Sequence, residues 1–166
     1  MKNLKLVLYR HAKTEDQSAL GDDMSRALTR RGKNDAHIMA QRLAMVFKPQ
    51  LILVSPAVRT MQTYEILIQT NGWGSIPVKK EPELYMPSLE TLLQCIFSLP
   101  PNLHSVLILG HNFALTDAIN LLTNTRLDNL PTAGFALINT QAPSGSILNK
   151  HTGILDVIEY PNIFKV

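Results

Sequence analysis

Residues 4–13 read Leu-Lys-Leu-Val-Leu-Tyr-Arg-His-Ala-Lys, an apolar run that ends in an arginine and a histidine. The part from Leu4 to Tyr9 is short, apolar and compatible with a β-strand, and no turn residue separates it from the charged pair. Arg10 and His11 are therefore expected at the carboxyl end of a strand.

Apolar runs of strand length alternate with helical patterns along the rest of the chain. Thr29 is expected to cap a helix from about Arg30 to Phe47. Ser55 and Pro56 form a helix-start signal, which predicts a helix that carries Arg59 in its first turn and ends at residues 71–72. Further strands are predicted at 51–54, 76–80, 106–109, 135–139 and 154–160, and further helices at 89–98 and 113–123.

This alternation predicts the fold class α/β, as a three-layer α/β/α sandwich. The central sheet is expected to be mostly parallel and to close with an antiparallel pair. No linker divides the chain, so residues 1–166 are expected to form a single domain.

The composition indicates a globular chain of 166 residues, with 45% hydrophobic and 17% charged residues and a formal net charge of +3. The basic residues are dispersed, so the charge favours anionic ligands without predicting a nucleic-acid partner. Cys95 is the only cysteine, which excludes an internal disulfide and a Cys-based zinc site, and its apolar setting is typical of a buried thiol. No run reaches the length of a membrane span or a secretion signal, so a cytoplasmic protein without a membrane partner is expected.

Three predicted strands end in residues that bind anions or transfer protons. Arg10 and His11 follow the first, the segment from Ser55 to Arg59 follows the second, and His111 follows the strand that ends in Gly110. Ligands of open α/β sheets bind beyond the carboxyl ends of the strands, where helix N-termini also point. The sequence therefore predicts an anion site at this edge.

Two arginines and two histidines are suited to phosphoryl transfer. An arginine binds phosphate oxygens in pairs and never deprotonates, whereas a histidine acts as nucleophile or proton donor near neutral pH. An imidazole nitrogen would attack phosphorus in line while cationic groups hold the equatorial oxygens. The phosphohistidine formed would then be hydrolysed.

The motifs that carry these residues resemble, in order, those of the histidine phosphatase superfamily. The strand followed by Arg10-His11-Ala12-Lys13 is similar to its Arg-His-Gly signature, with alanine in place of glycine. The segments 26–32, 55–63 and 109–112 resemble the motifs that come next. The similarity covers nearly the whole chain and is closest to the phosphohistidine phosphatases of the SixA type, which implies a phosphoglycerate mutase-like fold.

The resemblance implies a role for each matching residue. His11 is the expected phosphorylated nucleophile, and Arg10, Arg59 and His111 are expected to bind the phosphoryl group. Arg26 is expected as a peripheral substrate contact, and two further residues, Thr14 and the backbone N–H of Asn112, are placed within reach of phosphate oxygens. No cofactor and no metal site are expected; His37, His104 and His151 match no motif and are expected to be structural or exposed.

The chain departs from the family where ester-cleaving members carry a glutamate acid after the third strand. Met86 falls at that position, and Glu81 and Glu83 are near but out of register. An alkoxide leaving group needs a proton from an acid, whereas a protonated phosphoramidate leaves as neutral imidazole. The missing acid therefore favours phosphohistidine on a partner protein, such as a phosphotransfer domain or phosphocarrier, as the substrate.

Other functions remain open on the sequence alone. A small-molecule phosphomonoesterase would use the same scaffold, with Glu81, Glu83 or water as the proton source. A non-catalytic phosphate-binding module would not need His11. A dinucleotide-binding protein is not favoured, because Arg10 and His11 stand where a glycine-rich turn is expected.

Overall fold

The computed structural model describes residues 2–164. It contains one six-stranded sheet, in the strand order β3-β2-β4-β1-β5-β6. The strands are β1 (Lys5–Arg10), β2 (Leu51–Val54), β3 (Val78–Lys80), β4 (Ser105–Gly110), β5 (Phe135–Asn139) and β6 (Ile154–Glu159). The helices are α1 (Arg30–Val46), α2 (Val58–Asn71), α3 (Leu89–Phe97) and α4 (Ala114–Thr123), with short 3₁₀ segments at Pro82–Leu84, Gly145–Ile147 and Pro161–Phe164.

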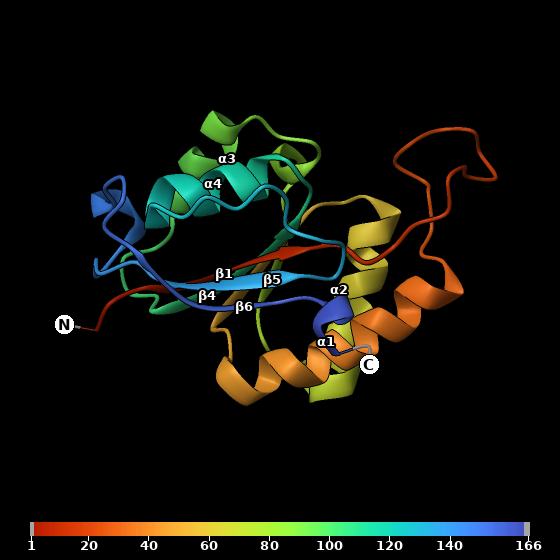
Figure 1. Cartoon of the computed structure of the whole chain (residues 1–166), viewed down its shortest axis with the longest axis horizontal. Coiled ribbons are helices and arrows are strands. Elements are labelled where there is room, and N and C mark those ends of the chain that lie inside the picture. Colours follow the sequence, from red (N-terminus) through yellow and green to blue (C-terminus); the bar gives the residue numbers. More distant parts are fainter. Residues whose placement is uncertain (1, 165–166) are drawn as a thin grey trace.

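The sheet lies between two pairs of helices (Figure 1). Helices α1 and α2 pack together on one face, and α3 and α4 pack together on the other. Strands β3, β2, β4 and β1 are parallel, whereas β5 is antiparallel to both β1 and β6. The predicted three-layer sandwich with a mostly parallel sheet is confirmed. Within residues 2–164 no helix is long and apolar enough to cross a membrane.

Alternation along β1 builds a core on each face of the sheet. Leu6 and Leu8 join the cluster under α3 and α4, while Val7 and Tyr9 join the cluster under α1 and α2. All four side chains are fully buried. Successive side chains of a strand point to opposite faces, so the apolar run seen in the sequence is that of a strand covered on both sides.

Most helix ends follow the sequence signals. The hydroxyl of Thr29 accepts a hydrogen bond from the Gly32 N–H at 2.9 Å and caps α1, and Gly72, at φ 66°, ends α2. The expected start of α2 at Ser55 and Pro56 is wrong, because α2 begins at Val58 and no side chain caps it. The Ser55 hydroxyl lies 2.7 Å from Nε2 of His111 and accepts only a long bond, at 3.4 Å, from the Ala57 N–H.

Residues that matched no motif lie mostly at the surface. His37 and His151 are exposed and His104 is half-buried, and the ring of His37 is hydrogen-bonded to Thr70 at 3.0 Å. Cys95 is half-buried, not fully buried as expected, since α3 turns it toward the rim of its core cluster.

A close backbone contact joins the start of α1 to the segment after β1. The Lys13 carbonyl accepts a hydrogen bond from the Thr29 N–H at 2.9 Å, and a Cβ on Gly32 would lie 2.1 Å from the same oxygen. Only glycine allows this approach, which holds α1 against the residues that follow His11.

We expect Gly32→Ala to destabilise the protein by about 2 kcal/mol or more, measured by urea denaturation. Alanine in place of glycine normally stabilises a helix by about 1 kcal/mol, so the clash with the Lys13 carbonyl decides the sign. Gly74→Ala is the control, because no atom lies within 4 Å of the Cβ it would add. Equal stability of the two variants would contradict the close approach.

Candidate active site

Three parallel strands deliver the candidate residues to one edge of the sheet. Arg10 at the end of β1 lies opposite Gly110 at the end of β4, and Val54 at the end of β2 lies opposite Leu109. The ends are thus level, and the next residues of each strand enter the same space. The Arg10-His11 pair, His111 and the turn that leads to Arg59 meet there.

His11 is held by its backbone and by one ring nitrogen. Its N–H donates to the Gly110 carbonyl at 3.2 Å, and its own carbonyl accepts from the Ala133 N–H at 3.0 Å. The ring Nδ1 lies 2.8 Å from the carbonyl oxygen of Ala12. A carbonyl only accepts, so Nδ1 carries the proton and Nε2 keeps a free lone pair.

Burial determines the charge of His11. Its side chain is 8% exposed, and burial lowers its pKa to about 4. The bond to Ala12 opposes this shift, whereas the nearby positive charges of Arg59, Arg10 and Arg26 add to it. The imidazole is therefore neutral at neutral pH, which is the form that can act as a nucleophile.

His111 lies beside His11 in a similar environment. The two ring centroids are 5.3 Å apart, and Tyr85 contacts the His111 ring edge-on at 5.6 Å. Its Nε2 lies 2.7 Å from the Ser55 hydroxyl, and its Nδ1 is buried without a partner among residues 2–164. Burial, then the proximity of His11 and Arg59, lowers the pKa of His111 to about 3.

Arg10 and Arg59 bring positive charge to the two histidines. Arg10 donates from Nη1 to the Leu130 carbonyl at 2.8 Å, and its Nε has no partner within the described chain. The Arg59 side chain, 4% exposed, donates to the backbone carbonyl of Asp23 at 2.8 Å and to its carboxylate at 3.0 Å. Each guanidinium is thus fixed by protein oxygens before any ligand arrives.

Asp23 and its partner Tyr85 are site residues that the sequence analysis does not predict. The Asp23 carboxylate accepts hydrogen bonds from the Tyr85 hydroxyl at 2.5 Å, from Arg59 and from Arg26 at 3.0 Å. These contacts, that of Tyr85 first, lower the pKa of Asp23 to about 2, so the carboxylate is ionised. The only local signal is its place three residues before Arg26, since Tyr85 and Arg59 are distant in the sequence.

The secondary candidates also line the site. The Thr14 hydroxyl accepts from Arg26 at 2.6 Å, so these two side chains form one unit at the rim. The side-chain oxygen Oδ1 of Asn112 accepts a hydrogen bond from the Thr116 N–H at 3.2 Å and thereby holds the first turn of α4.

A cavity of about 250 Å³ brings all seven candidate residues together. We call it the phosphoryl cavity. It is lined by Arg10, His11, Lys13, Thr14, Asp23, Arg26, Arg59, Met86, His111, Asn112 and Thr132. Four cationic side chains against one carboxylate make it a site for an anion. Nowhere in residues 2–164 do three or more His, Cys, Asp or Glu side chains gather as a metal site.

Comparison with known proteins finds a match to one superfamily. A sequence model of the histidine phosphatase superfamily, branch 1, matches residues 6–85, which include the first three of the four motifs. This matched part, just under half of the chain, is similar to the superfamily. An uncharacterized chloroplastic protein of Arabidopsis thaliana is 30% identical to it over 145 residues, 81% of this chain and 65% of that protein. The chain thus spans less than two thirds of that relative.

Solved structures match the fold over nearly the whole chain. A protein of Agrobacterium tumefaciens, provisionally named phosphohistidine phosphatase SixA, matches with a TM-score of 0.82 and 24% identity, over 97% of this chain and 99% of that one. The protein histidine phosphatase SixA complexed with tungstate matches with a TM-score of 0.80 and 20% identity, over 98% and 100%. At these identities the likeness concerns the fold.

The expected departure from the ester-cleaving members of the superfamily is visible in the cavity. Met86 lines it, with its sulfur 3.7 Å from Nη2 of Arg59. Glu81 and Glu83 line a different pocket together with Lys79 and Cys95, and Glu81 is paired with Lys79 at 2.5 Å. Among the residues of the phosphoryl cavity, Asp23 is the only carboxylate, and it is ionised.

The buried histidines make folding stability depend on pH. The pKa values of His11 and His111 lie below the usual 6.5, so the unfolded chain binds more protons between pH 6.5 and about 4. The contribution of the two neutral histidines to the free energy of unfolding is complete above pH 6.5 and is lost as the pH falls through that window. Each histidine changes the free energy of unfolding by up to about 1.4 kcal/mol per pH unit. Urea denaturation across this range should show a shallower slope for His11→Asn, and an unchanged slope for the exposed His37→Asn.

Replacing the Asp23 carboxylate should strengthen anion binding. Asp23→Asn keeps an acceptor for Arg59 but removes the negative charge that repels a phosphate, so we expect inorganic phosphate to bind roughly fivefold more tightly in calorimetry. Asp22→Asn is the matched control, because Asp22 makes the same charge change one residue away and lies outside the phosphoryl cavity. Weaker binding to Asp23→Asn would mean that the carboxylate mainly orients the arginines.

Proposed function

We propose that this chain is a phosphatase that forms a phosphohistidine intermediate on His11 and acts on phosphohistidine of a partner protein. The observation that carries the proposal is the state of His11. Its Nε2 is unprotonated and lies in a cavity whose arginines and second histidine suit a phosphoryl group. A neutral imidazole with a fixed ring is the form that nucleophilic attack requires.

In the first step Nε2 of His11 attacks the phosphorus of the substrate. The new P–N bond forms as the bond to the leaving group breaks, and negative charge stays on the three equatorial oxygens. Arg10 and Arg59 stabilise that charge, and the unpartnered Nδ1 of His111 would gain a phosphoryl oxygen as its hydrogen-bond partner.

In the second step water attacks the phosphorus bound to His11. The P–N bond to His11 breaks, inorganic phosphate leaves, and the imidazole returns to its neutral form. The bond from Nδ1 to the Ala12 carbonyl keeps the ring in one orientation through both steps. The arginines hold the same oxygens throughout, so one site serves both transfers.

The leaving group distinguishes between the possible substrates. An alkoxide needs a strong proton donor, and the phosphoryl cavity offers the thioether of Met86 and the ionised Asp23 in its place. A phosphoramidate protonated on nitrogen leaves as neutral imidazole. This chemistry favours P–N over P–O cleavage.

A protein substrate agrees with the surroundings of the cavity. Met86 is 55% exposed and Phe113, next to the cavity residue Asn112, is 63% exposed. Apolar side chains at the rim of a charged site suit contact with a protein surface better than with a free sugar phosphate. The fold relatives named as SixA phosphohistidine phosphatases support the same choice, and a phosphotransfer domain or phosphocarrier is the expected partner class.

The proposal is tested by comparing a phosphohistidine-bearing protein with p-nitrophenyl phosphate as substrates. His11→Ala should lose at least about 1,000-fold in kcat on both, because the nucleophile is removed. His37→Ala is the control, since His37 is an exposed histidine outside the cavity. Trapping with radiolabelled substrate should give an acid-labile phosphoryl group on the wild type and none on His11→Ala.

Each other outcome identifies an alternative. Faster turnover of p-nitrophenyl phosphate than of the phosphoprotein would make the chain a small-molecule phosphomonoesterase. Tight binding of phosphoprotein without turnover would make it a phosphate-binding module. Activity that survives in His11→Ala would refute the histidine mechanism.

A further inference from the structure

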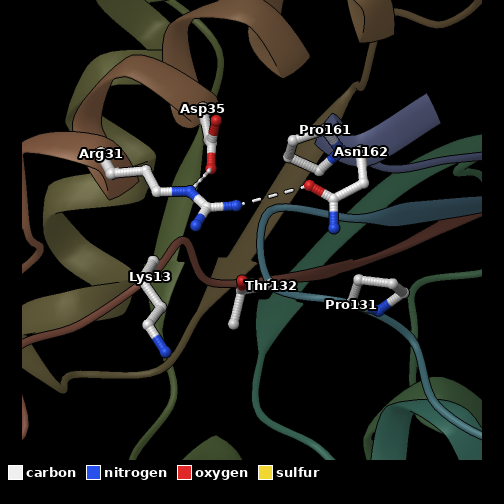
Figure 2. Close-up of a pocket in the computed structure, with 7 residues that line it drawn as sticks. All are labelled: Lys13, Arg31, Asp35, Pro131, Thr132, Pro161 and Asn162. Carbon is white, nitrogen blue, oxygen red and sulfur yellow. Dashed lines mark hydrogen bonds and ion pairs between the residues drawn. The ribbon is translucent and has the colours of Figure 1, made fainter. Parts of the chain in front are cut away.

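A second pocket opens beside the phosphoryl cavity and shares two residues with it. It measures about 170 Å³ and is lined by Lys13, Arg31, Asp35, Pro131, Thr132, Pro161 and Asn162. Lys13 and Thr132 also line the phosphoryl cavity, so the two spaces are neighbours across these side chains. We call this space the side pocket (Figure 2).

Two cationic side chains give the side pocket its character. No hydrogen bond or ion pair engages the Lys13 amine within residues 2–164, and Figure 2 shows this amine pointing away from Asp35. The Arg31 guanidinium lies 3.7 Å from the Asp35 carboxylate and 3.5 Å from the side-chain oxygen of Asn162. Both contacts are long, so Arg31 is oriented but retains donors for a ligand.

The charges of the side pocket match a single negative charge. Among the described residues that line the side pocket, two cations and the largely buried carboxylate of Asp35 leave a net charge of +1. A phosphate dianion would exceed this charge and would meet the Asp35 and Asn162 oxygens. A carboxylate carries one charge and pairs with a planar guanidinium through two hydrogen bonds.

The side pocket is built on backbone that is already held in place. The Lys13 carbonyl accepts from Thr29, and the Pro131 carbonyl accepts from the Gly134 N–H at 2.9 Å. Two prolines, Pro131 and Pro161, form part of its walls and cannot change φ. A ligand therefore meets fixed walls and loses little affinity to ordering.

We propose that the side pocket binds an Asp or Glu side chain of the phosphoprotein, close to the phosphohistidine that enters the phosphoryl cavity. This inference rests on the proposed function and adds a specificity determinant to it. The phosphoryl group occupies one space, the acidic side chain occupies the other, and Lys13 lies between the two anions. Arg31 is the residue that discriminates between acidic and neutral side chains, because it is a cation that lines the side pocket and not the phosphoryl cavity.

The experiment uses phosphohistidine peptides that carry one Glu, scanned along the positions on both sides of the phosphohistidine, each with a Gln counterpart. For wild type we expect one register in which Glu raises kcat/KM up to about fivefold over Gln, as for one partly exposed charge pair. In Arg31→Gln this ratio should fall to about one. Added salt should reduce the wild-type ratio because the pocket is partly exposed.

Arg30→Gln is the matched control. It removes the same charge from the preceding residue of α1, which is exposed and lines neither space. We expect the Glu-to-Gln ratio of this variant to equal that of wild type. Thermal unfolding of both variants at the wild-type temperature excludes a folding defect as the cause.

Phosphoramidate, which has no second anion, separates the two ideas. If wild type hydrolyses phosphoramidate and all peptides with no Glu preference in any register, the side-pocket proposal is overturned and the proposed function stands. If wild type hydrolyses none of these substrates, the proposed function fails and the side-pocket proposal fails with it. A preference for Glu that persists in Arg31→Gln would assign the effect to another surface.

Discussion

The parallel pairing of β1 with β4, and of β4 with β2, is the constraint on which the rest of the structure depends. It sets Arg10 opposite Gly110 and Val54 opposite Leu109, so that three chain segments leave the sheet at one level. A shift of one residue along β1 would move Tyr9 out of its core position and turn the Arg10 side chain into that apolar cluster. The hydrophobic core therefore fixes the register, and the register fixes the site.

A second constraint is electrostatic. Arg59 is almost fully buried, and a buried guanidinium needs a partner because desolvation of an unpaired charge is costly. Asp23 provides that partner through its carboxylate and its backbone carbonyl. The same dry, positively charged surroundings hold His11 neutral. One arrangement thus gives a paired arginine and an unprotonated imidazole, and it leaves the cavity with an excess of positive charge.

The sequence was sufficient for features that depend on neighbouring residues. The strand before His11, the cap at Thr29 and the end of α2 at Gly72 follow from local patterns, and the structure agrees. The start of α2 was mispredicted because Ser55 is used by His111, which is 56 residues away. Asp23 and Tyr85 were missed for the same reason, since their role depends on a contact across 62 residues. Long-range hydrogen bonds leave no periodicity that a single sequence can show.

The segment from Arg10 to Thr14 connects the phosphoryl cavity to the side pocket, because Lys13 lines both. Its backbone is anchored on both sides, because the Ala12 N–H donates to the Thr63 hydroxyl at 3.1 Å and the Lys13 carbonyl accepts from Thr29. Side chains that leave such a segment are positioned before the substrate binds, so little binding energy is spent on ordering them. The His11 ring is therefore held in a fixed orientation at the phosphoryl cavity, and Lys13 extends from the same fixed backbone to the boundary of the side pocket. Under the proposed function, a partner whose acidic side chain lies at the wrong distance from its phosphohistidine would not satisfy both positions. The rigidity of this segment would then allow the protein to discriminate between partners.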